Sequence, residues 1–319
     1  MKEQYIAQLQ ANEEITDFFL VKTVAIKMGS NRKQYLDILL GDKSGEAYGK
    51  KWDISDNEFE GLGKINPGDI IKVKAVVTEW NGAKQLKIFK IRHTGPEDEI
   101  EKADFFKAAP EAPEDMYAYI FQRADDMTDP HFSMLAKRLL TDNKDRLMYW
   151  PAAARNHHAE YAGLLYHVKR MLMVAERICE IYTNLNKDLL LVGVIVHDIE
   201  KLNEMNSDEN GIVSEYTFDG IMLGHLIQGI VTIDKLSEEL GIPHEKKIML
   251  EHMILSHHYE PEYGSPKRPL FPEAEALHYL DMLDSKMFDM EEALFGAEVG
   301  SFSDRIWTLD NRRVYKRNW

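Results

Sequence analysis

Residues 188–199 read DLLLVGVIVHDI, an apolar run that ends on the adjacent residues His197 and Asp198. We expect the run to form a helix of the protein core, because it is apolar over more than two helical turns. A buried histidine and a buried carboxylate cost several kcal/mol each unless they have partners. The stretch therefore predicts a helical domain that carries a polar centre inside its core.

Four other helical segments place histidine or aspartate on or beside an apolar stripe. Helical residues three or four positions apart share a face, so these placements follow from the spacing. The segments are 164–182 with His167, 221–230 with His225 over Ile221 and Met222, 246–258 with His257 and His258, and 274–290 with Asp281 and Asp284. One such histidine is usually an ordinary core residue, but five histidines and two or three aspartates directed toward one core need a common explanation.

A shared metal site explains this set, because an ion neutralises buried carboxylates and uses the lone pairs of buried imidazoles. Nitrogen and carboxylate ligands without sulfur suit Mn, Fe, Co, Ni or Zn, and the ligands outnumber those of one tetrahedral ion. The single cysteine, Cys179, excludes an intramolecular disulfide and makes a thiolate site implausible. The sequence therefore predicts a metal centre that can hold two ions.

The two halves of the chain differ in pattern. From residue 18 to 93, short β-rich runs alternate with turn residues, among them the hairpin signal Asn81-Gly82. From 117 to 290 the apolar residues recur at helical spacing. We therefore expect a multidomain, all-β plus all-α protein, in which an OB-type β-barrel precedes an all-helical domain. The predicted parts are the OB-fold domain 1–95, a linker 96–115, the helical domain 116–300 and a basic, aromatic tail 301–319.

Charge is divided unevenly along the 319 residues, whose net charge is −15. Residues 15–95 hold 14 Lys and Arg against 10 Asp and Glu, or +4, which leaves 25 against 44, or −19, for the rest. The barrel is therefore the expected binding domain for a polyanion such as a nucleic acid strand. Its candidate base-stacking side chains, each of which can instead belong to the core, are Trp52, Trp80 and Phe89. The candidate phosphate-binding side chains beside them are Lys50, Lys51, Lys84 and Lys87.

No feature of the sequence indicates a membrane or export. No apolar stretch approaches 18 residues, and the N-terminus lacks the apolar segment of a signal peptide. We expect no membrane partner, and the cytoplasm is the expected location.

The order of the polar side chains resembles the HD superfamily of metal-dependent phosphohydrolases, which is named after a His-Asp pair. The binuclear branch of that superfamily also has a middle histidine and a His-His pair. The resemblance implies that Asp198 bridges two ions and that the first aspartate of Asp281-Met282-Leu283-Asp284 is the ligand, while Asp284 supports a ligand. The implied ligands are His167, His197, Asp198, His225, His257, His258 and Asp281.

Longer stretches, 157–167, 255–258, 264–266 and 277–281, look like the bacterial YhaM-type 3'-to-5' exoribonucleases, which join an OB barrel to an HD domain. The resemblance covers nearly the whole chain. Glu200, Tyr166 and Val168 replace the family's usual Gly, Glu and Thr, but none of them replaces a ligand. The resemblance implies two divalent metal ions, with Mn²⁺ preferred over Fe, Co, Ni, Mg or Zn, and a homo-oligomer. The basic and aromatic residues of the tail suit a nucleic acid, a subunit contact that serves assembly, or packing back onto the helical domain.

The expected reaction is hydrolysis of single-stranded RNA, with single-stranded DNA as a second substrate, to nucleoside 5'-monophosphates. Two cations about 3.5–4 Å apart would activate water and neutralise charge at the phosphodiester. Asp198 and Lys201 are the predicted catalytic residues. The predicted substrate contacts are Lys201, His158, Trp52, Lys51 and Lys84, with His157 as a further candidate.

Two other functions fit parts of the same pattern. Related metal centres hydrolyse cyclic dinucleotides or free nucleotides, but the Gly-Tyr-Pro element of the cyclic-dinucleotide group is missing after Asp198, and a strand-binding barrel would be superfluous. A non-catalytic RNA-binding regulatory protein would retain the barrel. The complete set of ligands argues against it, because loss of catalysis usually leaves gaps in such a set.

Overall fold

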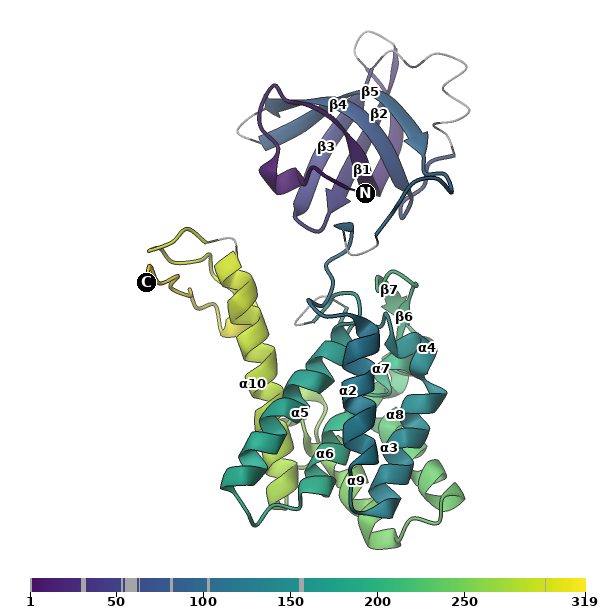
Figure 1. The fold of residues 1–319 in the computed structure, drawn as a ribbon, viewed down its shortest axis with the longest axis vertical. Coiled ribbons are helices and arrows are strands. Elements are labelled where there is room, and N and C mark those ends of the chain that lie inside the picture. The colour runs from purple at the N-terminus through teal and green to yellow at the C-terminus, as the bar shows by residue number, and fades with distance from the viewer. Residues whose placement is uncertain are drawn as a thin grey trace. The chain divides into compact units, whose positions relative to one another are not determined.

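The computed structural model describes residues 2–319, except 30–32, 53, 55–61, 63, 81–82, 102–103, 155–157 and 296; the side chains of Trp80 and Ala83 are also left out. The chain forms two compact units, Met1–Ala108 and Ala109–Trp319 (Figure 1). Asn81-Gly82, the predicted hairpin turn, and His157 lie outside the described residues, as does the side chain of Trp80.

The first unit is a closed barrel of five strands in the order β1-β2-β3-β5-β4, the strand order of an OB fold. All neighbours pair antiparallel except β3 and β5. The register of β1 shifts between Val21 and Thr23, so that its first half pairs with β4 and its second half with β2. The strands are β1 (Glu14–Met28), β2 (Gln34–Asp42), β3 (Gly45–Lys51), β4 (Ile70–Trp80) and β5 (Ala83–His93), preceded by the 3-10 turn η1 (Ile6–Gln8).

Strand β3 has no apolar run that predicts it. Its inward positions are Ala47, Gly49 and Lys51, two of which are small. A side chain at position 49 would collide with the barrel interior, because its Cβ would stand 2.7 Å from Cδ1 of Ile88. The crowded interior therefore selects small residues here, and the usual alternation of large apolar residues is lost.

Part of the predicted linker belongs to the barrel unit. Phe105 and Phe106 are buried against Phe18 and Leu20, and Tyr5 donates a hydrogen bond from its hydroxyl to Asp104. The division between the two units accordingly falls at residue 108 instead of within an unpacked segment that starts at residue 96.

The second unit is helical and is built around α6 (Lys187–Val196), which contains most of the apolar run. Every residue from Leu189 to Val196 is buried, and α6 contacts α2, α3, α5, α9 and α10. A short hairpin of β6 (Met205–Ser207) and β7 (Val213–Tyr216) is an addition to the predicted all-helical pattern. The helices are α2 (Pro113–Asp125), α3 (Pro130–Asp142), α4 (Lys144–Leu147), α5 (Gly163–Ile181), α6 (Lys187–Val196), α7 (Lys201–Glu204), α8 (Phe218–Glu239), α9 (His244–Ser256), η3 (Pro261–Tyr263) and α10 (Pro272–Phe295).

Helix α8 is kinked at Gly224, which has φ 68° and ψ 167°. The expectation that His225 shares a face with Ile221 and Met222 is wrong for this reason. His225 is 8% exposed, whereas Ile221 is 72% exposed. A positive φ is accessible to glycine at little cost, so the glycine allows the helix to restart in a new direction.

The tail folds back beside the C-terminal end of α10 (Figure 1). Isolated bridges join Phe302 to Tyr315 and Ile306 to Arg312, around the turn η4 (Trp307–Leu309). Lys286 of α10 donates a hydrogen bond of 2.7 Å to the carbonyl of Thr308. Within the described residues, no helix is both long enough and apolar enough to cross a membrane.

Candidate metal centre

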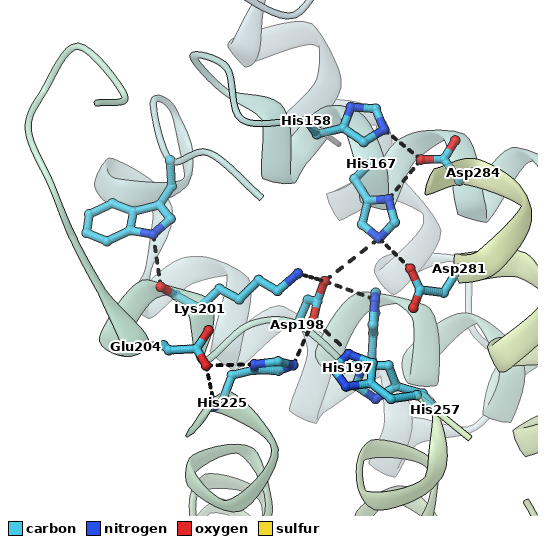
Figure 2. A network of polar contacts seen from close by, with 12 residues as sticks. His158, His167, His197, Asp198, Lys201, Glu204, His225, His257, Asp281 and Asp284 are labelled. Atoms are coloured by element: carbon cyan, nitrogen blue, oxygen red, sulfur yellow. Dashed lines mark hydrogen bonds and ion pairs between the residues drawn. The ribbon is translucent and has the colours of Figure 1, made fainter. Parts of the chain in front are cut away.

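The predicted ligands lie together around Asp198; Figure 2 labels all of them except His258. One carboxylate oxygen, Oδ2, lies 3.3 Å from Nε2 of His197 and 3.8 Å from Nε2 of His167. The other oxygen, Oδ1, lies 3.4 Å from Nε2 of His225 and 3.8 Å from Nε2 of His257. Asp198 therefore presents one oxygen to each of two pairs of histidines.

The donor atoms form groups of a size that suits a metal ion. Within each group the donor atoms lie within 4.8 Å of one another. Each of the seven predicted ligands belongs to at least one of three overlapping groups: His167 with His197 and Asp198; His197 with His257 and Asp281; and His225 with His257 and His258. The structure thus brings together all the residues that the sequence assigned to the ions.

The histidine rings are oriented by hydrogen bonds on the side away from the centre. In each of the five rings Nδ1 has a fixed partner, so Nε2 is the nitrogen left for a ligand bond. The partners, at 2.7–3.1 Å, are Asp284 for His167, the Val194 carbonyl for His197, Glu204 for His225, the Ile254 carbonyl for His257 and the Tyr263 carbonyl for His258.

Four buried atoms of the centre that could coordinate a metal ion have no hydrogen-bond partner within the described part of the chain. They are Nε2 of His197, His225 and His257, together with Oδ1 of Asp198. An unsatisfied buried polar atom costs about 1–3 kcal/mol, more when it is charged. Divalent cations bound between these atoms would remove that cost, so the residues fit a metal ion with nitrogen and oxygen ligands.

Asp284 holds His167 in place. Its Oδ2 accepts hydrogen bonds of 2.8 Å from Nδ1 of His167 and from Nε2 of His158, and Nε of Arg170 lies 2.6 Å from its Oδ1. Burial disfavours charge on His167, but hydrogen bonds to Asp281 and Asp284 outweigh burial and raise its pKa to about 9. The arrangement supports the prediction that Asp284 contacts a ligand instead of an ion.

The prediction that His158 contacts RNA is wrong, because its side chain is buried. Its side chain is 0% exposed, and its ring centroid is 4.0 Å from that of Phe288. Because His158 is enclosed and hydrogen-bonded to Asp284, it supports the carboxylate that orients His167.

Known proteins resemble both the helical domain and the chain as a whole. An HD domain model matches residues 164–286, which include every predicted ligand. A 3'-5' exoribonuclease YhaM from Halalkalibacterium halodurans is 38% identical over 314 residues, 98% of this chain and 96% of that protein. The chain belongs to the YhaM family.

Solved structures of replication protein A domains match about a third of the chain. The second OB-fold domain of replication protein A from Methanococcus maripaludis is 18% identical and covers 31% of this chain and 98% of its own, with a TM-score of 0.24. A second structure of a domain of that protein is 25% identical over 28% of this chain and 92% of its own, also with a TM-score of 0.24. The OB fold of this YhaM-family chain is identified by its strand order.

Lys201 lies directly against the central carboxylate. Its Nζ is 2.7 Å from Oδ2 of Asp198. Burial disfavours its charge, but the negative charge of Asp198 outweighs burial and raises the pKa of Lys201. Asp198 is affected in turn: His197 and Lys201 hold the pKa of its carboxyl group well below the usual range despite burial. Both groups are therefore charged at neutral pH.

Two residues of the centre, Arg170 and Glu204, were missed by the sequence analysis. Arg170 lies one helical turn after His167, so helical spacing could have found it. Glu204 contacts His225 only because a hairpin and a kinked helix fold back on α7, and no local spacing signals this. Glu200 accepts hydrogen bonds from Thr232 and Asn203.

The predicted barrel contacts differ in accessibility. Trp52 is 41% exposed and stacks on Tyr35, with ring centroids 4.4 Å apart and planes inclined by 23°. Lys84 is exposed and donates a hydrogen bond of 2.9 Å to the carbonyl of Ala7. Lys51 is only 5% exposed, because odd positions of β3 point into the barrel, and this burial argues against its predicted role.

Proposed function

We propose that this chain is a metal-dependent 3'-to-5' exoribonuclease that shortens single-stranded RNA and releases nucleoside 5'-monophosphates. The observation that carries the proposal is the position of Asp198, one oxygen of which faces each of two histidine pairs. The YhaM-family relative from Halalkalibacterium halodurans is named a 3'-5' exoribonuclease, which supports both the substrate and the direction.

We infer that the centre holds two divalent ions, with Mn²⁺ preferred. The presentation of one Asp198 oxygen to each of two histidine pairs supports two ions. When bound, such ions lower the pKa of a water molecule and neutralise charge on the phosphodiester oxygens.

The chain's own residues have separable tasks in this proposal. Asp198 bridges the two ligand groups and so fixes their spacing. Lys201, which is charged and adjacent to Asp198, is positioned to contact a nonbridging phosphate oxygen and stabilise the charge that develops there. Asp284 keeps His167 oriented, so that the ligand does not have to reorganise during the reaction.

The barrel is proposed to hold the strand through aromatic and basic side chains on neighbouring strands β2, β3 and β5. Tyr35 and Trp52 form one stack, and Lys50 lies 5.8 Å from the Tyr35 ring centroid. Lys50 pairs in register with Lys87, whose Nζ lies 5.9 Å from the ring centroid of the exposed Phe89. Bases stack on such rings and phosphates pair with the lysines, whatever the sequence of the strand.

Replacing Trp52 with alanine is expected to weaken binding of a long single strand by about 5- to 150-fold, because stacking is worth about 1–3 kcal/mol per base. The rate at saturating concentrations of a dinucleotide substrate should stay unchanged. Fluorescence anisotropy with labelled RNA measures the binding. Tyr182→Ala, which removes an exposed tyrosine from the helical unit, is the matched control; equal weakening in both variants would contradict the role of Trp52.

We also propose that the protein binds single-stranded DNA and that it assembles into a homo-oligomer. Stacking of bases on aromatic rings and pairing of phosphates with lysines do not require a 2'-hydroxyl, so DNA strands are expected to bind as well. Assembly into a homo-oligomer is supported by the exposed aromatic side chains Phe295, Trp307 and Trp319 at the end of α10 and in the tail.

A cytoplasmic location stays a prediction.

One assay tests the proposed function. RNA labelled at its 5' end is incubated with the protein and Mn²⁺, with and without EDTA, beside circular RNA and a cyclic dinucleotide. We expect a ladder of shortening labelled products that requires metal, and intact circular RNA, because an exonuclease needs an end. Immediate release of a labelled mononucleotide would overturn the direction. Intact RNA, with or without cleavage of the cyclic dinucleotide, would overturn the substrate.

A further inference from the structure

We propose that Glu204 is a positioning residue for one of the two ions: it holds His225 so that His225, His257 and His258 form an ion site separable from the one that includes His167. This inference rests on the two-ion centre of the proposed function. It assigns a task to a residue outside the set of ligands, at the end of the short helix α7.

The same oxygen of Glu204 accepts two hydrogen bonds from His225. Oε1 lies 3.1 Å from the backbone nitrogen of His225 and 3.1 Å from its ring Nδ1, as Figure 2 shows. The first contact fixes the backbone and the second fixes the ring rotation. Together they leave Nε2 of His225 facing Oδ1 of Asp198 at 3.4 Å.

The kink at Gly224 explains why an outside carboxylate is needed. Where a helix restarts, its first N–H groups have no acceptor in the preceding turn. His225 is the first residue after Gly224, whose φ and ψ are not helical. Glu204 therefore acts as a cap for the restarted helix, and a negative charge is favourable at that end.

Glu204 is itself anchored to the first part of α8. The backbone N–H of Thr217 donates to the carbonyl of Glu204 at 2.9 Å, and the Thr217 hydroxyl donates to the carbonyl of Asn203 at 2.8 Å. A Cβ at Gly220 would stand 2.1 Å from the Glu204 carbonyl oxygen. The close approach shows that the backbones of α7 and α8 pack directly against each other. The backbone that carries the Glu204 carboxylate is therefore fixed.

The other half of the centre has a separate support of the same kind. Asp284 orients His167 through Nδ1, as Glu204 orients His225, and it is held by Arg170 and His158. These residues come from α5, α10 and the segment before α5. Each half of the centre therefore has its own carboxylate outside the ligand set, and loss of one carboxylate should leave the other half intact.

The test is a metal titration of the full-length protein without RNA. Mn²⁺ or Co²⁺ is added to metal-free protein, binding is followed by calorimetry and by the visible spectrum of Co²⁺, and metal content is measured after gel filtration. Wild type should bind two ions per chain. Glu204→Gln, which keeps the size but loses the charge, should bind one ion as before and the other about 10- to 100-fold more weakly. Glu215→Gln, on the exposed face of the neighbouring hairpin, should resemble wild type.

The outcomes separate this inference from the proposed function. Two unchanged ion sites in Glu204→Gln, or loss of both, would overturn the inference, as would a wild type that binds a single ion. If Glu204→Gln fails to fold by circular dichroism, Glu204→Asp replaces it, because it keeps the charge but draws the oxygen back from His225; the same selective weakening is expected. If Glu204→Gln shows the selective weakening while the wild type leaves RNA intact, the nuclease assignment is overturned and the role of Glu204 is not.

Discussion

Asp198→Ala is expected to lower the rate of RNA hydrolysis by about 150- to 4,000-fold, with the loss persisting at saturating RNA. Removal of one partner from a buried charge network costs about 3–5 kcal/mol, and about 1.4 kcal/mol corresponds to a factor of ten in rate. Asp198 faces both histidine pairs and Lys201, so its loss should disturb both ion sites together. Initial rates and metal content of the same samples measure the two effects.

Asp145→Ala is the matched control, because Asp145 is exposed on α4. It should retain the activity and metal content of wild type. An Asp198→Ala variant that keeps a tenth or more of the wild-type rate would contradict the assignment of Asp198 as the bridge between the two ligand groups.

Asp284→Ala is expected to give the second-largest effect, a fall of about 10- to 100-fold in affinity for one ion together with a loss of fold stability. The substitution leaves His158, His167 and Arg170 facing a space from which their shared carboxylate has gone. Breaking a buried charge network in this way costs about 3–5 kcal/mol. Metal titration measures the first effect, and thermal unfolding of the metal-free protein measures the second.

Asp284→Asn provides the comparison for this variant, since it keeps the volume and one acceptor oxygen while removing the charge. We expect its effects to be smaller than those of Asp284→Ala and in the same direction. Unchanged metal affinity in both variants would show that Asp284 does not orient His167 for metal binding.

Helical spacing predicted that histidines and aspartates gather in one helical core, and the resemblance to the HD superfamily selected the candidate ligands among them. His167 and Asp281 both lie on such helical stripes, and the structure brings both to Asp198 or its neighbours. His225 was predicted as a candidate ligand, but the expected helix face that it shares with Ile221 and Met222 does not exist. Its position depends on the kink at Gly224 and on Glu204, and neither effect follows from periodicity.

The supporting residues were harder to predict because their partners are distant in the sequence. His158 and Asp284 are separated by 126 positions, and a loop histidine with no stripe around it looks accessible. The barrel shows a related difficulty. In β3 the pattern of inward residues is interrupted by Gly49 and Lys51, so the sequence alone did not reveal that Lys51 points inward while Lys50 lies beside Tyr35.

Anomalous diffraction from crystals grown with Mn²⁺ can decide whether the helical domain holds a pair of ions. We expect two manganese peaks in each chain, one on either side of Asp198, with Nε2 of His167 and His197 toward one peak and Nε2 of His225 and His257 toward the other. A single peak, or peaks remote from Asp198, in crystals of a protein that degrades RNA would contradict the two-ion centre.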